Sequence, residues 1–247
     1  MSTRVVWFSY KMDALPLLES LACARQTFPA GTTFHVFDQD SAPLDDGTIS
    51  KLENGGAIYS QTSFERNGNL NGITSVRGEI ECFLSAVKDE DDILWKMDCD
   101  TLALRPWEVI LRHYERDGNL LGCGLRMPCH GYGWWGPSYT YRAAVLPVMQ
   151  EHFQTLPALK NPCEDIAMST WLLAANRKRA KTLPTKETGG PWSNYNWTTQ
   201  LSLEEYARRF GIVTFGSRYQ IKELSPAQQR EWQADHMRAM RLLAVKG

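Results

Sequence analysis

The sequence predicts an α/β protein whose single, mixed and mostly parallel sheet is flanked by helices. Short β-rich runs alternate with helical patterns through the first half of the chain, and an apolar run at 93–97 ends in two aspartates. Strands that alternate with helices imply crossover connections between parallel strands. With 247 residues, the chain can bury a substantial core. We therefore expect one domain that uses the carboxyl ends of its strands as a binding edge.

The first half of the chain alternates strands and helices. Residues 5–10 are β-rich, and a helix over 13–28 follows, with Asp13 as its cap and apolar residues at helical spacing on one face. The run at 33–37 reads as a second strand that ends at Asp38. The next expected elements are a short helix near 48–54, a strand near 57–59, a helix with Ile80, Phe83, Leu84 and Val87 on one side, and the strand that ends at Asp98.

The second half changes character after a helix near 107–116 and a strand near 120–125. Residues 128–141 are rich in glycine and aromatic residues, which favours loop and antiparallel elements. A helix is expected at 165–175. Ser225 followed by Pro226 predicts the start of a final helix, because proline is well tolerated at the first helical position.

Composition excludes several classes of protein. The formal net charge is -1, so no general basic field attracts nucleic acid, and the basic run at 177–181 reads as a solvated helix end. The six cysteines form no Cys-x-x-Cys pair, which favours reduced thiols over disulfides or a zinc site. No apolar run reaches the roughly 18 residues that a membrane span needs. The first residues lack a signal-peptide pattern, and a cytoplasmic protein is the expectation.

The two aspartates of the run 93–102 are the main candidate for chemistry. In an extended chain, residues i and i+2 point to the same face, so Asp98 and Asp100 project together from the end of a strand. Two carboxylates suit Mg²⁺ or Mn²⁺, and such an ion suits a diphosphate. The alternative is a solvated acidic turn. Lys96 shares this strand face, where it could pair with the carboxylates and compete with a metal, or could point away after a twist.

Three further residues are positioned to bind a nucleotide. Tyr10 ends the first strand, and Asp38, just past the second strand, could accept a hydrogen bond from a base N–H. Alternatively, Asp38 ends its strand through an Asx-turn. Arg77, near a helix start, could contact the nucleotide or its phosphates, or it could be an ordinary surface cation.

Four segments together resemble the A-type (Rossmann-like, metal-dependent) glycosyltransferases. They are the opening strand 5–10, the strand-then-Asp turn at 35–41, the Asp-x-Asp-Thr run at 96–106 and the acidic pair that opens a helix at 162–167. The run at 96–106 is similar to that of glycogenin-like sugar transferases. Many members of this family also supply a late histidine to the metal, and the candidate here, His236, lies inside the expected final helix.

The resemblance implies a role for each acidic residue. Asp98 would contact the ribose and share the metal, Asp100 would be the principal metal ligand, and Asp38 would contact the base. Asp165 would be the acceptor-side carboxylate, with Glu164 as its competitor. In an inverting reaction this carboxylate is the general base, and in a retaining one it positions sugar hydroxyls. The alternative is that Glu164 and Asp165 only stabilise a helix N-terminus.

An aromatic segment at 131–136 is the candidate for sugar contact. Tyr132, Trp134 and Trp135 lie among glycines, and flat aromatic faces stack on the apolar faces of sugars. In members of the resembling family, this region lines the donor-sugar and acceptor pocket. The alternative is that the two tryptophans divide between core and surface.

These observations predict a metal-dependent, hexosyltransferase-like glycosyltransferase with a nucleotide-binding half at 1–127 and an acceptor half with a C-terminal helix at 128–247. Its donor is a nucleotide-diphosphate sugar, with a UDP-sugar favoured. Its cation is Mn²⁺ or Mg²⁺, and its acceptor is a saccharide, protein or other hydroxyl. One alternative is a catalytically inactive carbohydrate- or nucleotide-binding homologue. Another is a sugar nucleotidyltransferase, although residues 9–13 lack the glycine-rich phosphate loop of that class. Nucleic acid is not indicated as a partner.

Overall fold

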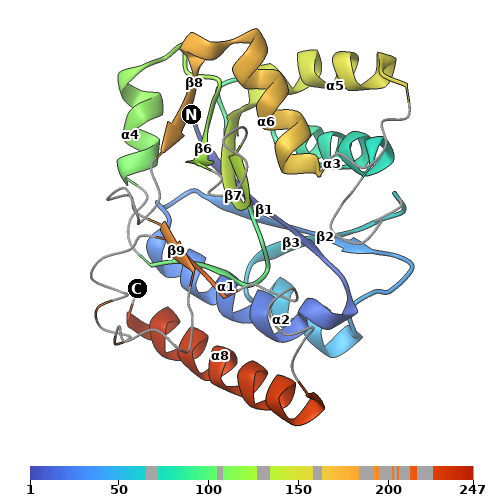
Figure 1. Ribbon diagram of the computed structural model, residues 1–247, viewed down its shortest axis with the longest axis vertical. Coiled ribbons are helices and arrows are strands. Elements are labelled where there is room, and N and C mark those ends of the chain that lie inside the picture. The colour runs from blue at the N-terminus through green and yellow to red at the C-terminus, as the bar shows by residue number, and fades with distance from the viewer. Residues whose placement is uncertain are drawn as a thin grey trace.

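The computed structural model describes residues 1–64, 72–104, 108–126, 134–157, 163–183, 192–194, 202, 205, 212–215 and 225–246 (Figure 1). Its main feature is a seven-stranded sheet with the order β3-β2-β1-β4-β7-β6-β8. The strands are β1 (Thr3–Ser9), β2 (Thr33–Gln39), β3 (Ala57–Thr62), β4 (Ile93–Met97), β6 (Gly122–Arg126), β7 (Trp134–Arg142) and β8 (Ala180–Leu183).

The sheet is mixed and mostly parallel, as the sequence predicts. β1 pairs in parallel with β2 and with β4, and β2 pairs in parallel with β3. β7 is antiparallel to both of its neighbours, β4 and β6, and it brings the glycine- and aromatic-rich part of the chain against β4. The carboxyl ends of β1, β2 and β4 therefore meet at one edge of the sheet, where α/β proteins place their ligands.

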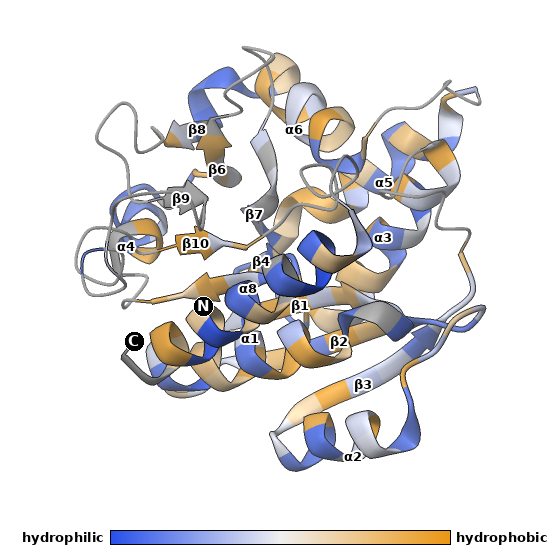
Figure 2. Cartoon of the chain, turned by 60° about the horizontal axis from the view of Figure 1, so that its bottom comes forward, coloured by the Kyte–Doolittle hydropathy of each residue, from blue (hydrophilic) through white to orange (hydrophobic). Residues whose placement is uncertain are grey.

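Helices cover both faces of this sheet (Figure 1). Alternate residues of β1 face opposite sides, with Val5 and Trp7 in one apolar cluster and Val6 and Phe8 in the other. Helices α1 (Ala14–Thr27), α2 (Asp46–Asn54) and α4 (Glu108–Arg116) pack on the first side. Helices α3 (Ile73–Ala86), α5 (Leu146–Thr155) and α6 (Glu164–Ala175) pack on the second. In Figure 2 the central strands are mostly apolar, whereas the helices carry both polar and apolar residues.

A second, three-stranded sheet lies beside α1. It consists of β5 (Thr101–Ala103), β10 (Ile212–Thr214) and β9 (Trp192–Asn194), in the order β5-β10-β9. Its apolar residues pack with those of the C-terminal helix α8 (Pro226–Lys246) in a third cluster. α8 also contacts α1 through an ion pair of 2.9 Å between Arg241 and Glu19. Because β5 directly follows the two aspartates, this small sheet fixes the chain on the far side of the candidate site.

Several expectations for local structure are confirmed. The apolar face of α1 is buried, α6 begins one residue before the expected start, and α8 begins at Pro226. The backbone N–H of Ser225 donates to the Gln228 side chain, and the N–H of Gln228 donates to Ser225 Oγ, which is a capping box. Helix α5 was not expected from the sequence.

Asp13 is the N-cap residue of α1, as the sequence predicts, but its side chain makes no capping hydrogen bond to the helix. A 3₁₀ turn at Lys11–Asp13 precedes the helix, and the Asp13 carboxylate instead accepts a hydrogen bond of 3.3 Å from the N–H of Tyr10. Asp13 is therefore turned back toward the carboxyl end of β1.

Two absences hold for the described part of the chain. None of its helices is both long enough and apolar enough to cross a membrane. Its five cysteines, at positions 23, 82, 99, 123 and 163, are free thiols, and Cys129 lies outside the described residues.

A buried ion pair ties β1 to the turn before β4, at the opposite edge of the sheet from the candidate site. Asp92 accepts hydrogen bonds from Arg4 at 3.0 Å and from the backbone N–H of Lys88 at 2.9 Å. Burial alone would raise the pKa of Asp92, but these bonds hold that pKa below its ordinary value. The resulting stability is present above the ordinary carboxylate pKa of about 4 and is lost as the pH falls through the lower, folded-state pKa.

Replacing Asp92 by asparagine is therefore expected to lower the free energy of unfolding by about 3 kcal/mol at pH 7, because Arg4 would remain buried without its partner. Urea denaturation measures the loss, and the difference from wild type should shrink below about pH 4. Asp91→Asn is the matched control, since the Asp91 side chain is 70% exposed and its loss should cost much less. Equal losses in the two variants, or a pH-independent difference, would contradict this account.

Candidate active site

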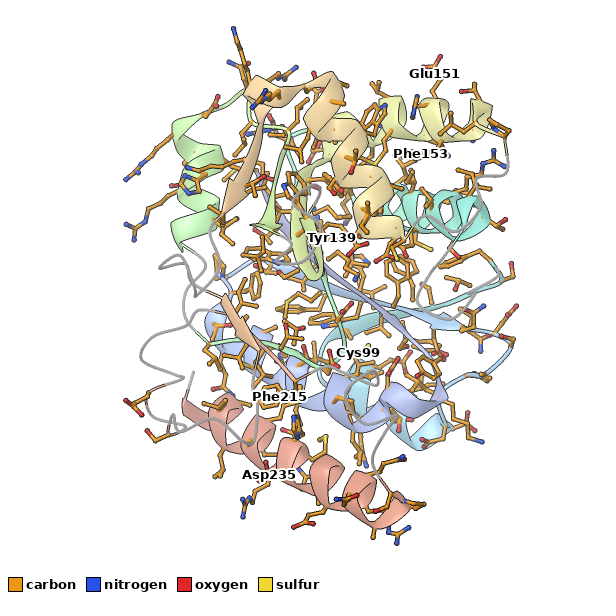
Figure 3. The ribbon with its side chains drawn as sticks, viewed as in Figure 1. Cys99, Tyr139, Glu151, Phe153, Phe215 and Asp235 are labelled. Carbon is orange, nitrogen blue, oxygen red and sulfur yellow. The ribbon has the colours of Figure 1, made fainter. Side chains whose placement is uncertain are left out.

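Asp98 and Asp100 lie in the turn that joins β4 to β5, at the carboxyl end of β4. The backbone N–H of Thr101 donates to the Asp98 carbonyl at 3.1 Å, and the N–H of Phe215 donates to the Asp100 carbonyl at 2.8 Å. Both side chains are half-buried, and the Asp98 side chain is 40% exposed. Between them, the Cys99 thiol donates to the Phe8 carbonyl at 3.3 Å and anchors the turn to β1 (Figure 3). The turn is therefore held on both sides while its carboxylates keep access to solvent.

Lys96 does not point away from the two aspartates. Its side chain is only 2% exposed, and its ammonium donates to Asp98 Oδ1 at 2.5 Å and to the Gly136 carbonyl at 2.6 Å. The ammonium also lies 3.6 Å from Glu164 Oε1. Of the two alternatives that the sequence left open for Lys96, the structure has the one in which the lysine pairs with a carboxylate.

Glu164 and Asp165 open helix α6 and are both buried. Asp165 Oδ1 accepts a hydrogen bond of 2.7 Å from the backbone N–H of Ile166, and α6 is tied to β7 by the Trp134 N–H, which donates to Ser169 Oγ at 2.8 Å. A helix N-terminus favours negative charge. Lys96 lies within ion-pair distance of Glu164 and of Asp98, so the acidic start of α6 and the end of β4 form one cluster, as the sequence order suggests.

Negative charge in this cluster exceeds positive charge. Desolvation by the surrounding protein raises the pKa of Asp100 to about 7, and the nearby carboxylates of Asp98 and Asp13 act in the same direction. Burial and the charge of Asp165 raise the pKa of Glu164 to about 8. Burial also raises the pKa of Asp165. Such shifts are typical of sites that are ready to take up a cation or a proton.

The same carboxylates stabilise the charged form of Lys96. Burial alone would lower the pKa of Lys96, but the carboxylates of Asp98, Glu164 and Glu79 outweigh burial and raise that pKa above its ordinary value. Lys96 is therefore a permanent cation within the cluster at neutral pH.

Two of the residues expected to bind a nucleotide are occupied by internal bonds. Asp38 is fully buried, and its carboxylate accepts from Ser9 Oγ at 2.9 Å, from the Leu44 N–H at 2.8 Å and from the Tyr59 hydroxyl at 2.7 Å. These three donors engage both carboxylate oxygens, and neither oxygen is exposed to a ligand. The structure therefore gives Asp38 a role in holding the end of β2.

The Arg77 side chain binds the C-terminal end of helix α5. Its guanidinium donates to three carbonyls at the end of α5, those of Phe153 at 2.9 Å, Gln154 at 3.1 Å and Leu156 at 2.8 Å. It thereby joins α3 to α5 and satisfies carbonyls that a helix leaves unpaired at its C-terminus.

Of the three aromatic candidates in segment 131–136, only Trp134 has a side chain that the structure describes. Trp134 is fully buried among the apolar residues beneath α6, and its indole N–H donates to Thr182 Oγ1 at 3.0 Å, so it packs in the core. Trp135 lies on β7, but the structure does not describe its side chain, and Tyr132 lies outside the described residues. Tyr10 is half-buried at the carboxyl end of β1, beside the end of β4.

The sequence predicts close backbone approach at the glycines of segment 131–136, but not that Gly136 lies on β7 between Lys96 and Asp165. The Gly136 carbonyl accepts from Lys96, and a Cβ added at this position would lie 2.8 Å from Asp165 Oδ2. The absence of a side chain therefore lets the Asp165 carboxylate approach the strand. A glycine inside a strand often marks such a close approach and is the signal that could have identified it.

Substitution of Gly136 by alanine is expected to displace the Asp165 carboxylate while preserving the fold. If the cluster is catalytic, a displacement of this kind should lower the turnover number by roughly 100-fold, with little change in the melting temperature. Gly118→Ala is the matched control, because a Cβ at Gly118 meets no atom within 4 Å. Wild-type turnover in Gly136→Ala would show that the close approach has no catalytic consequence.

Comparisons with known proteins give the fold but no sequence family. No protein-family model and no curated protein matches the sequence. Among solved structures, the galactosyltransferase LgtC in complex with donor and acceptor sugar analogues matches with a TM-score of 0.55 and 13% identity, over 98% of this chain and 95% of that one. The fold is that of the A-type glycosyltransferases.

Two larger glycosyltransferases share this fold over part of their length. The glycosyltransferase GlyE of Streptococcus pneumoniae TIGR4, in its apo form, matches with a TM-score of 0.57 and 10% identity, over 98% of this chain and 62% of GlyE. The bifunctional glycosyltransferase WbbM matches with a TM-score of 0.57 and 10% identity, over 88% of this chain and 46% of WbbM. At these identities the likeness concerns the fold alone.

Proposed function

We propose that this chain is a metal-dependent glycosyltransferase that moves a sugar from a nucleotide-diphosphate sugar to an acceptor hydroxyl. The observation that carries the proposal is the gathering of Asp98, Asp100, Glu164 and Asp165 around Lys96 at the ligand-binding edge of an A-type glycosyltransferase fold. Burial and neighbouring carboxylates raise the pKa values of Asp100 and Glu164, and shifts of this kind are concentrated at functional sites.

The donor atoms at the end of β4 fit a hard divalent cation. Asp98 and Asp100 offer carboxylate oxygens, and the pKa of Asp100 is raised first by burial and then by the neighbouring carboxylates, whose charge a cation would neutralise. In the described part of the chain, no three Asp, Glu, His or Cys side chains form a metal site by themselves. Proteins often hold Mg²⁺ through one or two carboxylates together with substrate phosphates and water, and Asp98 and Asp100 could supply the carboxylates. Such a cation would stabilise the charge that develops on the leaving diphosphate.

The start of α6 supplies the acceptor side of the proposed reaction. Asp165 is fixed by the backbone N–H of Ile166 and lies against Gly136. In an inverting reaction, its carboxylate would take the proton of the acceptor hydroxyl as that oxygen attacks the anomeric carbon. In a retaining reaction, it would orient sugar hydroxyls. Glu164 is the competing carboxylate, but its position beside Lys96 favours a structural partnership with the lysine.

Tyr10 is our remaining candidate for contact with the nucleotide, because it lies at the carboxyl end of β1 beside β4. Asp38 and Arg77 are assigned to support of the fold, since internal partners occupy both side chains. Tyr132 and Trp135 stay proposals for contact with the sugar. A UDP-sugar is the favoured donor, and a saccharide is the favoured acceptor by analogy with the complex of LgtC.

One observation favours a second candidate, a catalytically inactive homologue that only binds a nucleotide or carbohydrate. Lys96 occupies one oxygen of Asp98, which a metal would otherwise use. Isothermal titration of UDP with and without Mn²⁺ separates the two candidates. Binding that does not depend on the metal would favour the inactive homologue.

A donor screen tests the proposed function. UDP-, GDP- and CMP-sugars are incubated with the protein with Mn²⁺, with Mg²⁺ or with EDTA, and nucleotide release is measured. We expect release from a UDP-sugar that depends on the metal, and NMR of the released sugar then assigns the reaction as inverting or retaining. An absence of metal-dependent release from every donor, with and without a panel of saccharide acceptors, would refute the proposal.

A further inference from the structure

The side chain of Lys96 is the point at which the two acidic parts of the site are joined. Its ammonium has three N–H donors and lies beside three acceptors, Asp98 Oδ1 at 2.5 Å, the Gly136 carbonyl at 2.6 Å and Glu164 Oε1 at 3.6 Å. These acceptors belong to the end of β4, to β7 and to the start of α6. A single buried cation thus connects three elements that are distant in sequence.

We propose that Lys96 is a positioning residue that holds the donor-side carboxylate Asp98 in a fixed orientation relative to the acceptor-side pair Glu164 and Asp165. This inference rests on the proposed function, because it assigns the donor and acceptor sides from that function. Lys96 is not a catalytic residue, because its side chain is only 2% exposed and its ammonium is hydrogen-bonded to Asp98 and to the Gly136 carbonyl, so it does not reach a substrate phosphate.

The surroundings of the ammonium explain why a lysine is needed there. Glu79, Glu164 and Asp165 are all buried, and their charges act on Lys96 or on one another. Without a cation, these carboxylates of α3 and α6 would repel one another and the Asp98 carboxylate at the end of β4. The ring of Tyr139 lies on β7 directly opposite Lys96, with its centroid 5.4 Å from the ammonium, and adds a cation–π contact (Figure 3).

The contact between Lys96 and Asp98 weakens metal binding. Asp98 Oδ1 is engaged by the ammonium, which leaves Oδ2 for a cation, and a cation bound there would be repelled by the nearby positive charge. Lys96 therefore weakens metal binding while it orders the carboxylates for transfer. Removal of Lys96 should therefore raise the affinity for the metal and lower the turnover number. Simple damage to the fold would lower both.

The test compares Lys96→Met with the wild type. Mn²⁺ is titrated into the nucleotide-free protein and followed by electron paramagnetic resonance. Metal-dependent turnover of the donor sugar and the melting temperature are measured on the same samples. Lys96→Met is expected to bind Mn²⁺ roughly tenfold more tightly, because the competing charge is gone. Its turnover number is expected to fall by about 100-fold, because the carboxylates lose their fixed geometry.

Two further variants complete the comparison. Lys96→Arg retains the positive charge and should keep the Mn²⁺ affinity of the wild type. Arg4→Met is the matched control, because it also removes a buried cation from an aspartate, Asp92, but at the opposite edge of the sheet. It should lower the melting temperature and leave Mn²⁺ affinity and turnover unchanged below that temperature. If Lys96→Met does not fold, Lys96→Gln removes the charge, retains a donor for the Gly136 carbonyl and carries the same expectation.

The outcomes distinguish this inference from the proposed function. If the wild type binds Mn²⁺ and turns over a donor, but Lys96→Met has unchanged turnover or weaker Mn²⁺ binding, the positioning role is overturned and the proposed function stands. If the wild type binds Mn²⁺ but shows no metal-dependent turnover, the proposed function fails and the positioning role fails with it. Tighter Mn²⁺ binding with lost turnover in Lys96→Met, and not in Arg4→Met, supports both.

Discussion

Replacing Asp100 by alanine is expected to abolish both hydrolysis of the donor and transfer of the sugar, with a loss of about a thousandfold or more in turnover. A loss of that size corresponds to roughly 4 kcal/mol of transition-state stabilisation, the scale expected when a metal no longer neutralises the leaving diphosphate. Asp100 is half-buried, and its burial together with the neighbouring carboxylates raises its pKa. Its removal relieves repulsion, so the melting temperature should not fall.

The control for Asp100→Ala is a carboxylate that lies outside the cluster. Asp40 follows β2 and is exposed, so Asp40→Ala should retain full activity and stability. Titration with Mn²⁺ should show lost affinity in Asp100→Ala and wild-type affinity in Asp40→Ala. Unchanged turnover in Asp100→Ala would remove the metal assignment.

Asp165→Asn is expected to reduce transfer far more than it reduces donor binding. The asparagine oxygen can still accept from the Ile166 N–H, so the start of α6 should keep its structure. A neutral amide cannot take a proton from the acceptor hydroxyl, and loss of such a base typically costs 10²–10⁴-fold in rate. Turnover is measured with saturating donor and acceptor, and donor affinity is measured by isothermal titration.

Glu164→Gln is the comparison for this prediction. Glu164 lies beside Lys96, so its substitution should disturb the ion-pair cluster, while Asp165→Asn should act on the reaction. If Asp165→Asn lowers donor binding and transfer by the same factor, Asp165 is a structural cap of the helix.

Patterns that are local in the sequence predicted much of the fold. The β-rich runs predicted β1, β2 and β4, and apolar residues at helical spacing predicted α1, α3 and α6. The i, i+2 relation placed Lys96 and Asp98 on the same strand face, and the structure has them in contact. These features depend on backbone periodicity, which a short window of sequence contains.

Features that depend on distant parts of the chain could not be predicted in this way. The strands of the small sheet, β5, β9 and β10, are three residues long, too short for a periodic pattern. Whether Lys96 pairs with Asp98 or turns away is decided by Gly136 on β7 and Glu164 on α6. Likewise, the partners that occupy Asp38 come from β1, from β3 and from Leu44. Asp38 and Arg77 looked available in the sequence because most of their partners, all except Leu44, lie more than twenty residues away along the chain.

The most direct test of the account is a crystal structure of the protein grown with Mn²⁺ and UDP, in which the anomalous signal of manganese locates the metal. The account predicts one manganese peak within coordination distance of Asp100 and Asp98 Oδ2 and of the diphosphate oxygens, with Lys96 still bound to Asp98 Oδ1. A nucleotide bound elsewhere, with no manganese at the carboxyl end of β4, would contradict it.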